Sequence, residues 1–332
     1  MPDVSHQAPA FAVVRDAPAP AALRGAITAI GNFDGVHRGH RLLIDAARAR
    51  ARAVGRPAVA LTFEPHPRSV LRPDQPFFRL SDEATKLRLL AATGLAGVFV
   101  VRFDRALASM PAEAFVHEIL IERFGIAGAV IGFNFQFGSR REGTPEFLAA
   151  EGARRGFSVD ILAQLEDEGR PVSSQAVRAA LAGGRVVEAA ALLGYPWLIS
   201  GTVIQGDQRG RTLGYPTANI RPDPACGLRH GIYAVRVGVG GKRYDGVASF
   251  GRRPMYETDT PLLEAFLFDF NGDLYGQAID VAFLAFIREE MKFDSADALV
   301  RRMNEDSRIA REALARQPDA FPPLGEASLG TP

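Results

Sequence analysis

The strongest constraint on the fold is the ten-residue segment GNFDGVHRGH, residues 31–40, which stands between an apolar run and a helical pattern. The apolar residues 26–30 predict a strand, and residues 41–53 predict a helix. A strand that turns sharply into a helix presents backbone N–H groups and the positive end of the helix dipole at the turn. The segment therefore predicts a βα motif that holds an anion.

Two residue types in this segment suit a nucleotide phosphate. Gly35 and Gly39 let the backbone approach a ligand closely. His37 and His40, three residues apart, can both hydrogen-bond one phosphate group. The alternative is a glycine-rich turn whose histidines are only solvated. A zinc site is disfavoured, because Cys226 is the only cysteine and no third ligand stands at metal spacing.

Length and composition limit the class of protein. A chain of 332 residues predicts two domains, and a net charge of +1 gives no support for a nucleic-acid or membrane partner. The 36 arginines against 3 lysines indicate a coding bias rather than a polyanion partner. A single cysteine is typical of a reducing compartment, and no apolar stretch reaches the roughly 18 residues of a membrane helix. We therefore expect a cytoplasmic protein with no signal peptide, as a monomer or weak homo-oligomer.

The first half of the chain alternates strand and helix patterns. Strands are predicted at residues 11–15, 26–30, 58–63, 97–103, 129–133 and 157–161, and helices at 41–54, 82–93, 111–124, 145–155 and 174–182. Such alternation predicts an α/β, Rossmann-like domain with a parallel sheet and helices on both faces. His37, His66 and Asn134 each follow a predicted strand, so they should converge on the carboxyl edge of the sheet.

The pattern changes after a short predicted helix at residues 186–193. Short strands are predicted at residues 198–204, 231–239, 243–249, 263–270 and 278–286, with turn residues between them. They predict a small antiparallel β-barrel, followed by a helix that Asp294 or Ser295 caps and that reaches about residue 314. The predicted domains are residues 1–185 and 186–318, with a flexible tail at 319–332.

Three further segments of the first half could bind a ligand. In TFEPHP, residues 62–67, two prolines flank His66 and could wall a pocket, or the segment is a rigid loop. In GFNFQFG, residues 132–138, Asn134 between aromatics suits a flat ring, or the phenylalanines belong to the core. In SSQAVR, residues 173–178, the hydroxyls and Arg178 could grip a phosphate, or they form an ordinary N-cap and a solvated arginine.

The second half carries a glycine- and arginine-rich segment, GTVIQGDQRGRTLGYPTANI, at residues 201–220. A loop of this kind could cover phosphates, and the oxygens of Thr217 and Asn219 are suitable ligands for Mg²⁺ shared with ATP. The alternative is a hairpin loop rich in turn formers. Glu264 stands in the apolar run LLEAFLF, where it could act as a general base or simply point outward by strand alternation.

With these motifs in this order, the chain resembles the bacterial bifunctional riboflavin kinase/FAD synthetase family over nearly its whole length. The resemblance implies an N-terminal domain that adenylylates FMN and a C-terminal barrel that phosphorylates riboflavin. It implies ATP as co-substrate, Mg²⁺ as cofactor, riboflavin and FMN as partners, and FMN and FAD as products. Two alternatives stay open: only one half is active, or the chain is a non-catalytic regulator that binds flavin or nucleotide.

The resemblance also assigns roles to single positions. Nucleotide or phosphate binding falls on Gly31, Asn32, Phe33, Gly35, Gly39, Ser174, Arg178, Gly206, Arg211 and Gly214. Flavin binding falls on His66, Asn134 and Phe135, metal binding on Thr217 and Asn219, and catalysis on His37, His40 and Glu264. The family usually has Thr where this chain has Gln175, Asn-Ile-Gly where it has 249–251, and Pro-Thr where it has Pro254-Met255.

Overall fold

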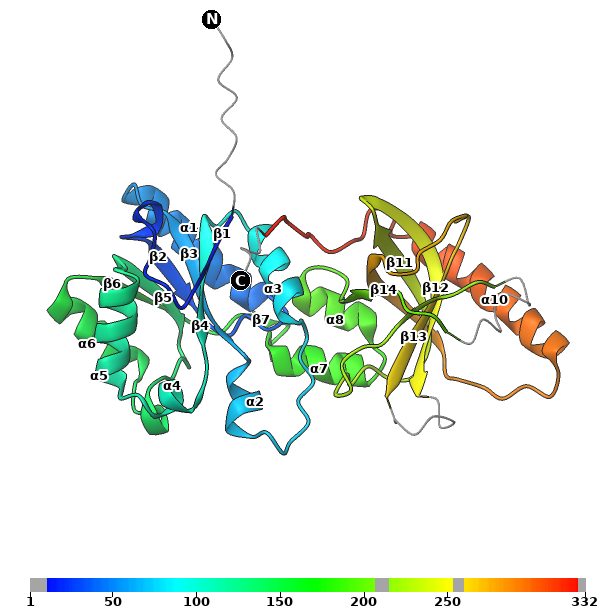
Figure 1. Cartoon of the computed structure of the whole chain (residues 1–332), viewed down its shortest axis with the longest axis horizontal. Helices are drawn as coiled ribbons and strands as arrows, with labels where there is room; N and C mark the ends of the chain where they lie inside the picture. Colours follow the sequence, from blue (N-terminus) through cyan, green and yellow to red (C-terminus); the bar gives the residue numbers. More distant parts are fainter. Residues whose placement is uncertain (1–10, 207–214, 253–259, 328–332) are drawn as a thin grey trace, which may run out of the picture. The chain divides into compact units, whose positions relative to one another are not determined.

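The computed structural model describes residues 11–206, 215–252 and 260–327, and its contacts divide the chain into two compact units (Figure 1). The first unit comprises residues 1–76, 82–172 and 323–332, and the second comprises residues 77–81 and 173–322. Gly325, in the segment predicted as a flexible tail, donates its N–H to the carbonyl of Arg88 in the first unit (2.9 Å). The domain limits 1–185 and 186–318 stay predictions.

The first unit contains a six-stranded parallel sheet in the order β1-β4-β3-β2-β5-β6. Its strands are β1 (Ala12–Arg15), β2 (Ile27–Ile30), β3 (Ala58–Glu64), β4 (Gly97–Arg102), β5 (Gly128–Gly132) and β6 (Ser158–Leu162). All six predicted strands are present, and their ends differ from the prediction by no more than one residue. The predicted α/β class is therefore confirmed.

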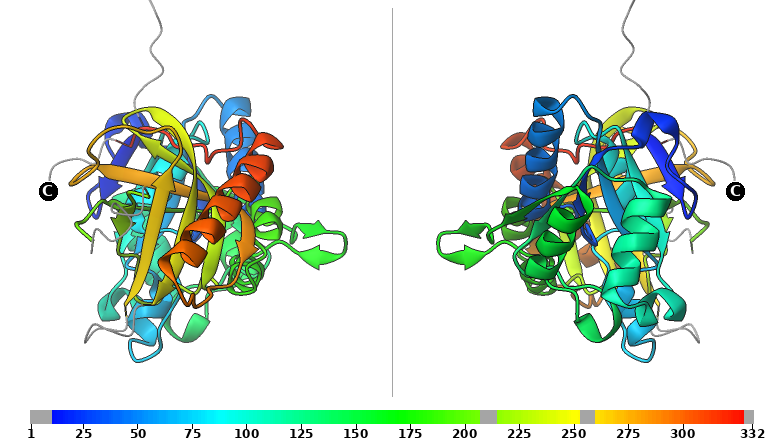
Figure 2. Two further views of the ribbon diagram at one scale, coloured as in Figure 1. Left: turned by 90° about the vertical axis from the view of Figure 1, so that its right-hand side faces the viewer. Right: turned by 90° about the vertical axis from the view of Figure 1, so that its left-hand side faces the viewer.

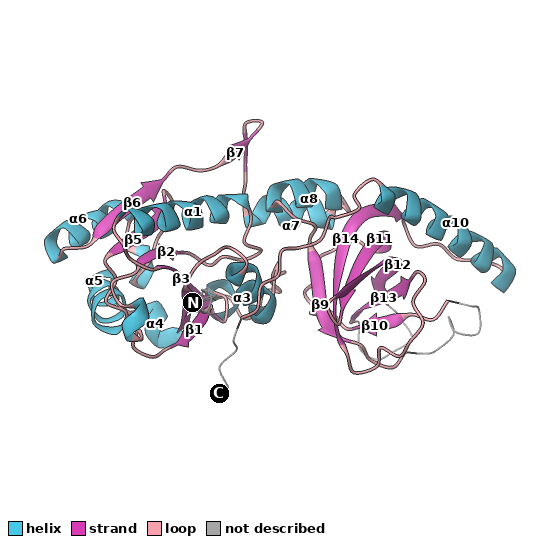
Figure 3. Ribbon diagram, turned by 90° about the horizontal axis from the view of Figure 1, so that it is seen from above, coloured by secondary structure: helices cyan, strands magenta, loops and turns pink. Residues whose placement is uncertain are grey.

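Helices cover both faces of this sheet, as the continuous apolar strands require. The unit's helices are η1 (Ala21–Leu23), α1 (Arg38–Ala53), α2 (Pro67–Leu71), α3 (Glu83–Ala91), α4 (Arg105–Ser109), α5 (Ala112–Ala114), η2 (Phe115–Arg123), η3 (Ser139–Arg141) and α6 (Pro145–Arg155). Helix α1 packs on β2, β3 and β5, while α5 lies on the other side of the sheet (Figure 3). On that side Phe115, Ile119 and Phe124 join the core of the unit.

The order of the strands creates a switch point beside β2. From β2 the chain continues to β3 and β4 on one side of the sheet, and it later returns to β5 on the other side. In open α/β sheets, ligands bind where the strand order reverses, outside the carboxyl ends of the strands. The segment at residues 31–40 follows β2 and therefore begins at this point.

The second unit contains an antiparallel sheet in the order β10-β13-β12-β11-β14-β9. Its strands are β9 (Leu198–Thr202), β10 (Ala218–Ile220), β11 (Gly231–Val239), β12 (Lys242–Arg252), β13 (Pro261–Leu267) and β14 (Ala278–Arg288). A bridge between Ile204 and Asn219 joins the two edges, so the sheet forms a nearly closed barrel. The predicted small barrel is confirmed.

Three helices complete the second unit: α7 (Ser174–Ala182), α8 (Val186–Leu193) and α10 (Ala296–Ala315). Ser295 caps α10, since its Oγ accepts a hydrogen bond from the N–H of Ala298 (3.2 Å). Helix α10 lies across β11, β12 and β14 (Figure 2), where Arg288 pairs with the buried Asp306 (2.6 Å). The described residues include no helix with the length and apolar character that crossing a membrane requires.

Several local elements differ from the sequence prediction. The helix predicted at residues 111–124 is instead the short α5 followed by the π-helical η2, whose wider turns set four apolar side chains into the core. Two five-residue helices, α2 and α4, were not predicted; the side chains of His66 and Asp104 cap them. The hairpin β7 (Glu166–Asp167) and β8 (Arg170–Pro171) was not predicted either (Figure 3).

Candidate functional site

The loop that follows β2 has an unusual backbone. Phe33 and Val36 have positive φ angles of 49° and 36°, and Gly35 between them has a φ of 77°. Both non-glycine residues are fully buried. Residues other than glycine rarely adopt such angles, and they do so where the surrounding structure fixes them, often at functional sites. The backbone thus supports the prediction that this turn is a specialised binding loop.

His37 and His40 lie together at the start of α1. His37 is the N-cap, and its Nδ1 accepts a hydrogen bond from the N–H of His40 (3.3 Å). The two imidazole rings stack with their centroids 3.7 Å apart at 20°. Since Nδ1 of His37 accepts, the neutral ring carries its proton on Nε2, where it can donate to an oxygen. The predicted pair is therefore a paired donor site at a helix N-terminus.

Gly39 makes this stacking possible. A Cβ at this position would lie 3.1 Å from Nδ1 of His37 and 3.3 Å from the carbonyl oxygen of Val172. Both approaches are tighter than most Cβ contacts, so a side chain would displace the imidazole or the backbone. The second glycine of the segment is thus explained by packing against His37.

The two other predicted segments of the first unit meet the same edge of the sheet. His66 follows β3 and Asn134 follows β5, and these strands flank β2. His66 caps α2 by accepting the N–H of Arg68 at Nδ1 (3.1 Å). Asn134 is exposed at the end of its strand. The structure therefore brings the three predicted segments to one edge.

The phenylalanines around Asn134 divide between surface and core. Phe133 is 47% exposed, whereas Phe137 is buried in the core. Phe135 is half-buried and stacks on Phe137 with their centroids 5.3 Å apart. Core packing therefore accounts for Phe137 and part of Phe135, and Phe133 is the aromatic side chain that a ligand could reach.

Ser174 and Arg178 belong to the second unit. Ser173 caps α7, since its Oγ accepts the N–H of Ala176 (3.2 Å). Arg178 donates from Nε to the carbonyl of Phe78 (2.6 Å), and its guanidinium lies 4.5 Å from the centre of the Phe77 ring. The phosphate-binding roles of Ser174 and Arg178 stay predictions.

A row of polar residues crosses three strands of the barrel. Asn219 on β10 pairs with Glu264 on β13, and Glu264 pairs with Ser249 on β12. Residues directly opposite each other on antiparallel strands place their side chains on the same face of the sheet. Glu264 is half-buried on the face that alternates with the core residues Leu263 and Ala265. Strand alternation thus explains its direction, but only the register shows its neighbours.

Asn219 has the properties of a cation ligand. It is 5% exposed, and its Nδ2 donates to the carbonyl of Thr217 (3.1 Å). No described residue donates a hydrogen bond to its buried Oδ1. A Cβ at Gly206 would lie 2.6 Å from Nδ2 of Asn219, so the glycine permits a close approach of the backbone. An amide oxygen held in this way, beside the Thr217 hydroxyl, fits Mg²⁺.

The rest of the predicted phosphate loop cannot be described. Arg211, Gly214 and Met255 lie outside the described residues. Within residues 11–206, 215–252 and 260–327, no three His, Cys, Asp or Glu side chains form a group that could hold a metal ion. The donor set at Thr217 and Asn219 is therefore of hydroxyl and amide oxygens.

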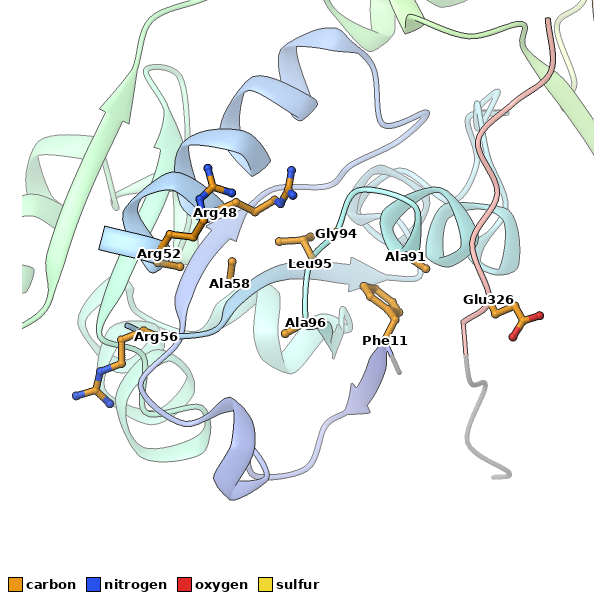
Figure 4. Close-up of a pocket in the computed structure, with 11 residues that line it drawn as sticks. Phe11, Arg48, Arg52, Arg56, Ala58, Ala91, Gly94, Leu95, Ala96 and Glu326 are labelled. Atoms are coloured by element: carbon orange, nitrogen blue, oxygen red, sulfur yellow. The ribbon is translucent and has the colours of Figure 1, made fainter. Parts of the chain in front are cut away.

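One cavity of about 480 Å³ lies in the first unit, away from these residues (Figure 4). Its lining residues are Phe11, Arg48, Ala51, Arg52, Arg56, Ala58, Ala91, Gly94, Leu95, Ala96 and Glu326. Phe11, Ala58 and Ala96 stand at the amino ends of β1, β3 and β4. The cavity thus opens at the edge of the sheet opposite to the predicted site.

Comparisons with known proteins follow the division into two halves. Residues 19–176 match the family model for FAD synthetase, and residues 193–314 match the model for riboflavin kinase. A bifunctional riboflavin kinase/FMN adenylyltransferase from Escherichia coli is 39% identical over 289 residues, which cover 87% of this chain and 92% of the relative. The protein of the same description from Bacillus subtilis is 34% identical over 296 residues, covering 86% of this chain and 91% of the relative.

A solved structure is also similar. A crystal structure from Streptococcus pneumoniae, titled a macrolide-efflux protein, has a TM-score of 0.81 and 32% identity. The match covers 91% of this chain and 99% of that one. It supports the fold of the chain from a solved example, and its title describes that protein alone.

Proposed function

The chain belongs to the bifunctional riboflavin kinase/FMN adenylyltransferase family, and we propose how its residues divide the family's two reactions. The enzyme phosphorylates riboflavin to FMN with ATP and then adenylylates FMN to FAD with release of pyrophosphate. The residue roles, the metal and the cytoplasmic location below are our proposals.

In the adenylylation, an oxygen of the FMN phosphate attacks the α-phosphorus of ATP, and the bond to the β-phosphate bridging oxygen breaks. An ionised phosphate needs no strong base, so the site has to reduce charge repulsion and stabilise the leaving pyrophosphate. The stacked pair His37 and His40, at the N-terminus of α1, supplies donors and a positive dipole end for this purpose. His66, Asn134 and Phe135 contact the flavin nucleotide.

In the kinase reaction, Glu264 removes the proton from the terminal hydroxyl of riboflavin as its oxygen attacks the γ-phosphorus of ATP. The departing ADP takes the electron pair of the broken P–O bond. Thr217 and Asn219 hold Mg²⁺, which neutralises part of the phosphate charge when bound. As in other phosphoryl transfers, positioning and electrostatic stabilisation provide most of the catalysis.

The register between β10 and β13 carries the kinase assignment. It places Asn219 directly opposite Glu264, although the two residues come from separate segments of the sequence. A general base beside a phosphate-binding metal ligand is the arrangement that transfer to an alcohol requires. The buried Oδ1 of Asn219 supports the metal in the same place.

The test is a time course of the purified protein with riboflavin, ATP and Mg²⁺, with the flavins separated chromatographically. FMN that appears first and FAD that follows would support both sites. FMN alone would leave only the kinase, and Gln175 would then be the first position to revert to the family's Thr. If riboflavin is unchanged but added FMN yields FAD, only the first unit is active. No product from either flavin would favour a binding protein without catalysis.

A further inference from the structure

A buried lysine lies beneath the phosphate-binding loop. Lys86 on α3 is 2% exposed, and its Nζ lies 2.6 Å from Oε1 of Glu64, which is 8% exposed at the end of β3. Lysine is rarely buried to this degree unless a partner compensates its charge. A buried ion pair adds little stability compared with apolar residues of the same size, so its presence calls for another explanation.

The other contacts of the ammonium group lead to the loop. Nζ of Lys86 donates to the carbonyl of Asn32 (3.3 Å) and lies 3.2 Å from Oγ1 of Thr62. The Thr62 hydroxyl donates to the same Asn32 carbonyl (3.1 Å). Two donors from α3 and β3 therefore converge on one backbone oxygen of the loop.

The position of that oxygen explains its importance. Asn32 directly precedes Phe33, the first of the two buried residues with positive φ, and the loop ends at His37. Backbone in sparsely populated conformations persists where neighbouring groups fix it. Fixing the Asn32 carbonyl at the start of the loop therefore fixes the path that the chain takes to the histidine pair.

We propose that Lys86, held by Glu64 and assisted by Thr62, is a positioning residue for adenylyl transfer. It anchors the Asn32 carbonyl and thereby sets the loop that presents His37 and His40. This inference rests on the proposed phosphate-binding role of that loop, and it assigns to Lys86 no contact with substrate.

The test replaces both charges at once, as Lys86→Met with Glu64→Gln, so that no unpaired charge is left buried. FMN adenylylation should lose about 100-fold in kcat, the scale expected when a reacting group is misplaced by about 1 Å. Riboflavin phosphorylation in the same molecules should keep its kcat and serves as an internal control. Amide hydrogen exchange should accelerate at residues 32–37 and stay unchanged in β4 and β5.

A matched control comes from another ion pair of the first unit. Arg155 and Glu151 on α6 pair at 2.6 Å, and Glu151 is buried. Arg155→Met with Glu151→Gln should leave adenylylation and loop exchange unchanged. An equal loss of adenylylation in both double variants would overturn the proposal, because it would indicate a general loss of stability.

Two further outcomes are decisive. A folded Lys86→Met/Glu64→Gln variant with wild-type kcat and wild-type exchange in the loop would overturn the proposal. If that variant does not fold, Thr62→Val removes only the hydroxyl donor; a loss of about 10-fold in adenylylation kcat would support the anchor, and no loss would overturn it. Wild-type protein that makes no FAD from FMN and ATP would instead reject the proposed function of the loop.

Discussion

Asn219 and Glu264 lie directly opposite each other on the antiparallel strands β10 and β13. Their side chains therefore share one face of the barrel, with Ser249 next in the same row. The pairing brings an amide oxygen, a carboxylate and a hydroxyl within reach of one substrate. It also makes the kinase residues independent of the histidine pair in the first unit, so the two reactions can be impaired separately.

We expect Glu264→Gln to lose riboflavin phosphorylation and to keep FMN adenylylation. Loss of a general base typically lowers the rate by about 10²–10⁴-fold, and glutamine keeps the shape of the side chain. The rates are measured separately, with riboflavin or with FMN as the starting flavin.

His40→Ala provides the reciprocal case. It removes one donor for the phosphates and should lower FMN adenylylation by about 10²–10³-fold, while riboflavin phosphorylation stays unchanged. If either variant lost both activities while its unfolding curve matched the wild type, the two sites would not be independent.

We expect Asn219→Ala to raise the Mg²⁺ concentration needed for half-maximal riboflavin phosphorylation. The change removes the buried Oδ1 and with it one metal ligand, so a shift of about 10-fold or more is expected, which corresponds to about 1.4 kcal/mol. The measurement is a Mg²⁺ titration of the kinase rate at fixed ATP. Asn271→Ala, at an exposed turn, is the control. A variant with lower kcat but an unchanged Mg²⁺ requirement would argue against the ligand role.

Hydrophobic periodicity was sufficient to predict most of the fold. Strands β2, β3 and β4 are buried on both faces, so their continuous apolar runs mark their ends within one residue. Alternation of strands with helices then implied the parallel sheet, and the carboxyl edge followed from that. The π-helical turns of η2 were not predictable, because its apolar residues fit an ordinary helix equally well along the sequence.

The site was predictable in its parts but not in its contacts. The histidines three residues apart already implied a pair, and their stacking is a local consequence of the start of α1. The pairing of Asn219 with Glu264 depends on the strand register, which the sequence does not specify locally. Burial of Lys86 likewise depends on Glu64, which lies on a different element of the first unit.

Cys226 should react slowly with alkylating reagents at neutral pH. Burial raises the pKa of its thiol to about 11, so at pH 8 about 100-fold less thiolate is present than in an unfolded chain. Iodoacetamide labelling followed by mass spectrometry gives the rate at each pH, and the protein in urea is the reference. Because the folded pKa lies above the unfolded one, the thiol's stabilisation is complete below the unfolded pKa and is lost as the pH rises through about 11. Labelling at pH 8 as fast as in urea would contradict this prediction.

Ser249 should contribute to the kinase through its place beside Glu264. The two residues are cross-strand partners, so the Ser249 hydroxyl stands close enough to act as a polar neighbour of the carboxylate. Ser249→Ala should lower the kcat of riboflavin phosphorylation by about 10-fold, the scale of one hydrogen bond. Ser249→Asn, which introduces the family's usual residue, should stay within about 3-fold of the wild type.

The barrel offers a matched control for Ser249. Ser200 pairs across β9 and β14 with Asp280, and its Oγ donates to that carboxylate (2.7 Å), so it is a serine in an equivalent setting away from Glu264. Ser200→Ala should leave kcat unchanged, even where both alanine variants lose similar amounts of unfolding free energy. FMN adenylylation should be unaffected in all three variants. Equal losses of kcat in Ser249→Ala and Ser200→Ala would show that the effect is one of barrel stability. A loss confined to Ser249→Ala would place Ser249 in the row that supports the base.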